Sequence, residues 1–224
     1  IKTVFPKIYT VRSKRYCIIF GAVTQVEHLY ICDHINGLTK GVFIMPLPRE
    51  RIYTIDDIYA LPEGERAELI DGQLYMMSTP SRIHQKLVSE FTQIIGQYIK
   101  SHRGSCEVYP APFAVFIKED DKSYVEPDVS VICDKNKLSD RGCEGAPDFI
   151  IEVVSPSSRR MDYYRKCTLY ADAGVREYWI VDPEKQRTMV YHYEDDAAPM
   201  IVPFDQELTV GIYSDLVINI AQFL

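Results

Sequence analysis

Residues 148–182, DFIIEVVSPSSRRMDYYRKCTLYADAGVREYWIVD, carry the clearest fold signal of the chain. The apolar run at 148–155 is typical of a buried strand. A helix is predicted from about Ser158 to Ala173, and Gly174 follows as its C-terminal stop. The apolar run EYWIVD then predicts another strand. A strand, a helix and a strand in this order are typical of an α/β domain.

The sequence on both sides of this stretch adds further helices and strands. Thr54 caps a short predicted helix, and Asp71-Gly72 is the turn of a predicted hairpin. Apolar residues recur near every 3.6 positions over 81–103, which predicts a long amphipathic helix. Further strand-like runs are CEVYPAPFAVFI, PDVSVIC and TMVYHY. We therefore expect an α/β domain with a mixed, curved β-sheet flanked by helices.

Residues 1–49 contain short strand-like runs and no recognisable motif. We expect an N-terminal β-rich extension at 1–49, without a catalytic group, and a separate domain at 50–224. His28, Cys32 and His34 lie close enough in sequence to suggest zinc ligands. Structural zinc sites prefer tighter paired spacing and a fourth ligand, so scattered core and surface residues are the favoured interpretation.

The composition is that of an ordinary globular protein, with 46% hydrophobic and 25% charged residues. No stretch reaches the roughly 18 to 20 apolar residues of a membrane helix, and no secretory signal is recognisable. A cytoplasmic location is therefore expected. Because no secretory signal is recognisable and none of the six cysteines forms a C-x-x-C pair, we expect all of them to be reduced.

The net charge of −7 is mild evidence against a general nucleic-acid binder, whose surface is usually basic. A carboxylate-rich metal site would add negative charge, and a local basic strip could still meet phosphate. The charge therefore does not exclude a nucleic-acid substrate. The densest basic run lies within the stretch quoted above and consists of Arg159, Arg160, Arg165, Lys166 and Arg176.

Two acidic residues are notable because they lie in apolar strands. Side chains alternate between the faces of a strand, so Glu152 shares a face with Ile150 and Val154. A carboxylate there is costly to bury unless it is paired or bound to metal, although a glutamate at a sheet rim, or one paired with an arginine, is an equal alternative. Asp128 starts another apolar strand. Two carboxylates on adjacent strands can share Mg²⁺, and the carbonyl of Val153 can add a ligand.

Lys166 lies on the helix that follows the Glu152 strand. A lysine near a metal-bound water can position that water, help to deprotonate it and offset the charge of phosphate. Asp162, Lys166 and Tyr170 follow at intervals of four residues, so they share one helix face. For Asp162 and Lys166 the favoured interpretation is an exposed helix ion pair, worth about 0.3 to 0.5 kcal/mol. Replacing Lys166 by Met should then abolish any hydrolysis that depends on this water and cost little stability.

Several separated motifs of the chain resemble those of a known family. They are PDVSVI, the quoted stretch at 148–182, and YTIDDIYALPEGERAELIDGQLYMMSTPSRIHQKL at 53–87. In this order they resemble the Uma family of putative restriction endonucleases, within the PD-(D/E)XK nuclease superfamily. The resemblance covers roughly residues 50–222. It implies a restriction-endonuclease-like core and nuclease activity.

The resemblance also implies roles for individual residues. Asp128 matches the Asp of the PD motif, and Glu152 matches the acidic residue of the (D/E)XK strand. Where the superfamily pattern has its lysine, this chain has Val154. In the family the lysine is relocated to the following helix in a K-x-x-x-Y arrangement, which Lys166 and Tyr170 match. We therefore expect the site to be intact.

Two further positions match the family. Glu68, in AELIDG, would be a third ligand beside the metal or, equally, a solvent-facing hairpin residue. His84, in SRIHQK, would contact phosphate or a carboxylate, although capping of the long helix is the favoured interpretation.

Together these observations predict an endonuclease that hydrolyses DNA phosphodiester bonds with Mg²⁺, or with Mn²⁺. Asp128, Glu152, Glu68 and the Val153 carbonyl would hold the ion, and Lys166 would orient the attacking water. The resemblance also suggests a homodimer. The rival interpretation, supported by the charge of −7, is a nucleic-acid-associated binding module that keeps the nuclease fold with little catalytic activity.

Overall fold

The computed structural model describes residues 17–20, 29–32, 41–44, 51–195, 197–213 and 215–224. The chain forms two compact units, Ile1–Arg51 and Ile52–Leu224, which are described separately. The first contains an antiparallel sheet of β1 (Cys17–Phe20), β2 (Leu29–Cys32) and β3 (Gly41–Ile44). The zinc hypothesis also needs His28 and His34, which lie outside the described residues.

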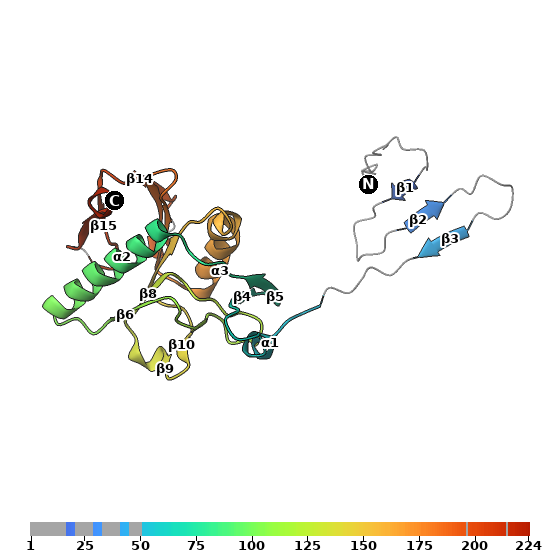
Figure 1. Cartoon of the computed structure of the whole chain (residues 1–224), viewed down its shortest axis with the longest axis horizontal. Coiled ribbons are helices and arrows are strands. Elements are labelled where there is room, and N and C mark those ends of the chain that lie inside the picture. Colours follow the sequence, from blue (N-terminus) through green and yellow to red (C-terminus); the bar gives the residue numbers. More distant parts are fainter. Residues whose placement is uncertain (1–16, 21–28, 33–40, 45–50, 196, 214) are drawn as a thin grey trace. The chain divides into compact units, whose positions relative to one another are not determined.

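A six-stranded sheet forms the centre of the second unit (Figure 1). Only the neighbours β11 and β12 are parallel, and every other pair is antiparallel. The prediction of a mixed sheet flanked by helices is therefore confirmed. In spatial order the strands are β14 (Met200–Pro203), β13 (Arg187–His192), β12 (Glu177–Asp182), β11 (Phe149–Val153), β8 (Val129–Ile132) and β6 (Glu107–Pro110).

The connection from β11 to β12 differs from the single α-helix that the sequence predicts. It runs through a π-helical segment, η2 (Met161–Arg165), and continues as α3 (Lys166–Ala173). Gly174 ends α3 at a φ of 87°, as its position predicts. A π-turn is wider than an α-turn and often occurs at a functional site. Here it lies between the strand of Glu152 and the helix of Lys166.

The two faces of the central sheet carry separate apolar cores. One face packs against α2 (Arg82–Ser101), the helix predicted over 81–103, and the C-terminal segment lies on this face too. The other face packs against α3. Side chains of β11 and of Val154 directly after it alternate between these cores as predicted: Phe149, Ile151 and Val153 face α2, while Ile150 and Val154 face α3.

The smaller elements brace the rim of the sheet. Leu69 bridges to Tyr124 through two backbone hydrogen bonds of 2.7 Å, so the predicted hairpin is held beside the strand that leads to Asp128. Asp71 and Gly72 turn this hairpin with φ values of 49° and 76°. The elements are α1 (Ile55–Tyr59), β4 (Ala67–Ile70), β5 (Gln73–Met76), β7 (Val115–Phe116), η1 (Lys135–Lys137), β9 (Leu138–Ser139), β10 (Gly142–Glu144), η3 (Tyr193–Asp195), β15 (Glu207–Thr209), β16 (Val217–Asn219) and η4 (Ile220–Phe223).

The expectation that all cysteines are reduced is wrong. Cys106 and Cys133 form a disulfide with an S–S distance of 2.08 Å. They flank β6 and β8, whose antiparallel register pairs Glu107 with Ile132 and so places the two cysteines opposite each other. Sequence spacing cannot reveal this register, because 27 positions separate the two residues. Within the described residues no helix is long and apolar enough to cross a membrane.

Candidate active site

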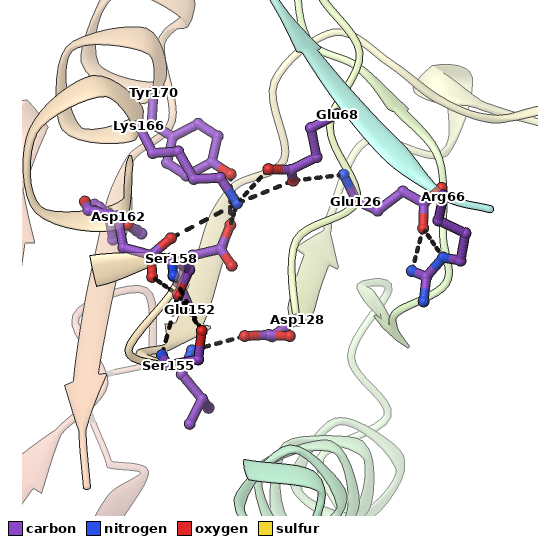
Figure 2. A network of polar contacts seen from close by, with 12 residues as sticks. Arg66, Glu68, Glu126, Asp128, Glu152, Ser155, Ser158, Asp162, Lys166 and Tyr170 are labelled. Carbon is purple, nitrogen blue, oxygen red and sulfur yellow. Dashed lines mark hydrogen bonds and ion pairs between the residues drawn. The ribbon is translucent and has the colours of Figure 1, made fainter. Parts of the chain in front are cut away.

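A cleft of about 1140 Å³ contains the residues that the sequence singles out. Glu68 comes from β4, Asp128 directly precedes β8, Glu152 lies on β11 and Lys166 begins α3. All four line this cleft, and Figure 2 shows the side chains converging from separate elements. The hairpin strand β4, the central strands β8 and β11, and the helix α3 thus bring together groups that are far apart in sequence.

Lys166 forms the centre of a buried polar cluster (Figure 2). Its Nζ lies 2.8 Å from Glu152 Oε1 and 2.9 Å from Glu68. A third carboxylate, that of Asp162, lies 3.8 Å away. The hydroxyl of Tyr170 donates to the same Glu152 Oε1 at 2.7 Å. Lys166 and Tyr170 therefore hold Glu152 from one helix face.

The interpretation of Asp162 and Lys166 as an exposed helix ion pair is wrong. Their relative exposures are 1% and 4%. Intervals of four residues correctly place them on one helix face, but they do not indicate what covers that face. Here it packs toward Glu152 and the hairpin residue Glu68. Because that interpretation is wrong, the low stability cost expected for Lys166→Met no longer holds.

The pKa directions within the cluster reflect an excess of acids. Burial lowers the pKa of Lys166, but the charges of Glu152, Glu68 and Asp162 outweigh it and hold that pKa well above the usual range. Burial raises the pKa of Glu152 well above its usual range, and nearby carboxylates add to this against the opposing charge of Lys166. Lys166 therefore stays an ammonium that several carboxylates share.

Glu68 is buried, so its reading as a solvent-facing hairpin residue is wrong. Its carboxylate contacts Lys166 and also accepts a hydrogen bond of 3.1 Å from the backbone N–H of Glu126. The close pairing of the hairpin with the segment before Asp128 positions it there.

Asp128 is held by two donors on its Oδ2. The backbone N–H of Val153 donates at 2.8 Å, and His84 Nε2 lies 3.1 Å away. Burial lowers the pKa of His84, but its hydrogen bond with Asp128 and the nearby charge outweigh this and raise the pKa above 6.5. The capping role favoured for the His84 side chain is wrong, since Ser81 caps α2 by accepting from the His84 N–H. The role of the Val153 carbonyl as a metal ligand stays a prediction.

Val154, which occupies the superfamily's lysine position, is packed in the apolar core beneath α3. A lysine there would have to bury its charge among apolar side chains. The ammonium of Lys166 instead contacts Glu152 from α3, one element later in the chain. The relocated lysine inferred from the resemblance therefore lies at the site.

Sequence reasoning missed a chain of hydroxyls behind Asp162. Ser155 Oγ lies 3.0 Å from Ser158 Oγ, which donates to Asp162 Oδ2 at 2.6 Å. At the rim, Ser157 and Ser78 meet at 3.2 Å between their hydroxyls. The SPSS motif in the loop after β11 is the signal that could have indicated them.

A second missed group lies under the hairpin. Glu126 is buried, forms an ion pair with Arg66 and accepts a hydrogen bond of 2.7 Å from the Tyr124 hydroxyl. Its position immediately before Pro127-Asp128, in an otherwise apolar segment, was the available signal.

The basic run expected to meet phosphate is largely neutralised. Arg159 forms ion pairs with Asp182 and Glu184, and Lys166 is buried among its carboxylates. Arg176 likewise pairs with two acids. Of the run, only Arg160 and Arg165 form no ion pair with a carboxylate of the described residues.

The donor set of the cleft suits a hard cation. Three buried carboxylates surround one ammonium, a fourth carboxylate lines the same cleft, and Asp162 Oδ1 has no hydrogen-bond partner. The carboxylates are those of Glu68, Asp128, Glu152 and Asp162. Within the described residues no three His, Cys, Asp or Glu side chains form a complete metal site. Mg²⁺ does not need one, because it usually takes one or two carboxylates and completes its shell with water and phosphate.

Comparison with known proteins places this cleft in a family. The model of the Uma2 family, described as putative restriction endonuclease, matches residues 55–220. The chain belongs to the Uma2 family. The match includes every candidate residue of the cleft and begins after residues 1–49, where no motif is recognisable.

Two Synechocystis proteins and one solved structure are similar to this Uma2 chain. The uncharacterized protein slr1290 is 28% identical over 143 residues, which are 63% of this chain and 74% of that protein. The uncharacterized protein sll1609 is 27% identical over 133 residues, 58% of this chain and 72% of that protein. A crystal structure described as a putative nuclease of DUF820 from Anabaena variabilis has a TM-score of 0.62 at 21% identity. The matched region covers 76% of this chain and 96% of the chain in that crystal structure. This likeness shows a shared fold.

Proposed function

We propose that the chain is a metal-dependent endonuclease that hydrolyses phosphodiester bonds of DNA. The observation that carries the proposal is the Lys166 ammonium between Glu152 and Glu68, in a cleft that Asp128 also lines. A protein that only binds DNA has no need for clustered carboxylates where phosphate must approach. Membership of the Uma2 family supports the same reaction class.

Asp128 and Glu152 would hold Mg²⁺ or Mn²⁺, with Glu68 and the Val153 carbonyl as further oxygen donors. A bound ion supplies charge stabilisation for the phosphate and lowers the pKa of a water molecule. His84 and the Val153 N–H fix the carboxylate of Asp128. Lys166 and Tyr170 fix that of Glu152. Two carboxylates that are already fixed in place would meet a cation with little reorganisation.

Lys166 would act as a fixed positive charge and not as a base. Its pKa is raised by the surrounding carboxylates, so it keeps its proton at neutral pH. An ammonium can donate three hydrogen bonds. Contacts to Glu152 and Glu68 use two of them, which leaves a donor to orient the attacking water or a phosphate oxygen.

The rival function is a nucleic-acid-binding module with little activity. The net charge of −7 supports this function. The arginines of the cleft are also held in ion pairs, so they offer little free charge to a substrate in the cleft. The two functions differ in one measurable respect, because only the nuclease requires Asp128 for the chemical step. Binding by the module would tolerate loss of that carboxylate.

A cleavage assay tests the proposal directly. Supercoiled, linear duplex and single-stranded DNA are incubated with the full chain in Mg²⁺, Mn²⁺ or EDTA. We expect cleavage with a divalent ion, none with EDTA, and none by Asp128→Ala. Asp215→Ala removes an exposed carboxylate outside the cleft and should cut normally. Equal cleavage by Asp128→Ala would contradict the mechanism, and binding without cleavage of any DNA form would favour the module.

The remaining expectations concern assembly and location. The homodimer and the cytoplasmic location stay predictions, and sedimentation of the full chain at several concentrations would test the first.

A further inference from the structure

The cleft itself offers little free positive charge to a polyanion. Its lining has three lysine or arginine side chains, each held in an ion pair: Arg66 with Glu126, Arg159 with Asp182 and Glu184, and Lys166 with Glu68 and Glu152. Lysine and arginine contacts to phosphate supply most of the affinity of proteins for nucleic acids. The phosphates of a nucleic acid other than the one that is cleaved therefore need unpaired cations elsewhere on this chain.

Such cations lie at the two ends of η2, where Arg160 directly precedes the segment and Arg165 is its last residue. Arg160 and Arg165 are exposed, and neither is ion-paired within the described residues. Between them lies Tyr164, whose exposed fraction of 72% is the largest among the large hydrophobic side chains of the described residues. In the wide turn of a π-helix, residues four or five positions apart face the same way. Arg160, Tyr164 and Arg165 thus form one patch, the RYR patch.

The RYR patch adjoins the cleft. Arg165 lies over the ring of Tyr75 at 5.5 Å, and Tyr75 lines the cleft. The inward face of the same helical connection carries Asp162 and Lys166. One helix therefore presents unpaired guanidinium groups on its outer side and the buried ammonium on its inner side.

We propose that the RYR patch docks a strand of nucleic acid next to the cleft. Arg160 and Arg165 bind successive phosphates, and an unpaired base stacks on the ring of Tyr164. Guanidinium groups bind phosphate oxygens, and an exposed aromatic ring accepts any base because every base has a π-face. The inference rests on the proposed function, and it adds a preference for a strand that is unpaired beside the cut.

The charge component is tested by binding in EDTA, where no cleavage occurs. Anisotropy of a labelled single-stranded 20-mer is measured with the full chain at several salt concentrations. Arg160→Gln/Arg165→Gln should weaken binding about tenfold and lower the salt slope by about 1.4, since each phosphate contact on a single strand contributes about 0.7. Lys100→Gln/Arg103→Gln removes two exposed charges near the far end of α2 and is the matched control. Equal losses in both double variants would overturn the proposal.

The stacking component has its own test. Tyr164→Ala should weaken single-strand binding by about 5- to 150-fold and leave the salt slope unchanged, while Tyr164→Phe binds like the natural chain. Blunt duplex DNA, which offers no unpaired base, should lose much less affinity in Tyr164→Ala. An equal loss on duplex and single strand, or no loss on either, would overturn the stacking role.

Failure of this inference can be distinguished from failure of the proposed function. If the chain cuts DNA in an Asp128-dependent way but the patch variants bind normally, the docking surface is wrong and the nuclease stands. If the chain binds and cuts no nucleic acid, both fail.

Discussion

Two buried glutamates on neighbouring strands of the central sheet have opposite surroundings. Glu152 on β11 contacts an ammonium shared with Glu68 and Asp162. Glu177 on β12 is as deeply buried, but its donors are the indole N–H of Trp179 at 2.7 Å and the backbone N–H of Ile212 at 2.9 Å.

Burial raises the pKa of both carboxyls, so neither burial nor the pKa separates them. What differs is the balance of charge and donors. The oxygens of Glu177 are satisfied by fixed neutral donors, and the backbone of Gly211 lies tightly against it. Around Glu152 the acids outnumber the single cation. An excess of buried charge beside a cleft, more than burial alone, indicates a functional site.

The largest effect should follow from removing the shared cation. Lys166→Met leaves three buried carboxylates without their ammonium, so the free energy of unfolding should fall by about 3 to 5 kcal/mol. Cleavage should be lost as well. Chemical denaturation measures the first effect, and Lys100→Met on the exposed face of α2 is the control. If Lys166→Met were as stable as the control, the interpretation of Lys166 as part of an exposed ion pair would be correct after all.

Neutralising Glu152 should separate activity from stability. Glu152→Gln keeps an acceptor for Lys166 and Tyr170 but removes one charge, so cleavage should fall by a factor of about 10² to 10³. The melting temperature should stay equal or rise, because buried negative charge is lost. Single-turnover cleavage and thermal denaturation measure the two effects. In Glu177→Gln the folded protein should cut at the natural rate, and a similar loss of cleavage there would remove the contrast.

The acid excess should also appear in the pH dependence of stability. Burial raises the pKa of Asp162 to about 6, against the opposing effects of Lys166 and Ser158. The folded chain then holds a proton that the unfolded chain has released, so stability falls as pH rises from about 4 to about 6. The loss is on the order of 2 to 3 kcal/mol, at about 1.4 kcal/mol for each unit. Asp162→Asn should flatten this part of the curve in EDTA, and parallel curves would contradict the shift.

The smallest effect belongs to the Glu177 region. A Cβ at Gly211 would lie 2.5 Å from His192 Cε1 and 3.0 Å from Glu177 Oε2. Gly211→Ala should therefore lower the free energy of unfolding by about 1 to 3 kcal/mol through overpacking, without changing the cleavage rate of folded protein. Gly96→Ala on α2 meets only Val108 at 3.3 Å and should be close to neutral. Reduced cleavage in Gly211→Ala would connect the two regions.

Much of the fold was predictable because it depends on local pattern. The 3.6-residue period produced α2, the alternation in β11 produced its two faces, and Asp71-Gly72 turned the hairpin. The π-helical turn of η2 was not predicted, since one inserted residue per turn leaves no clear trace in the apolar period.

The amino-acid sequence by itself determined which chemical groups are available and which of them share a face. It placed Glu152 between apolar neighbours, and it placed Lys166 and Tyr170 on one helix side, where the family resemblance also assigned them. Only the tertiary structure decided which faces are covered and which charges meet. Glu68 and Lys166 are 98 positions apart, and the disulfide cysteines are 27 apart. A periodic pattern fixes direction within one element, whereas burial and ion pairing depend on the element packed against it.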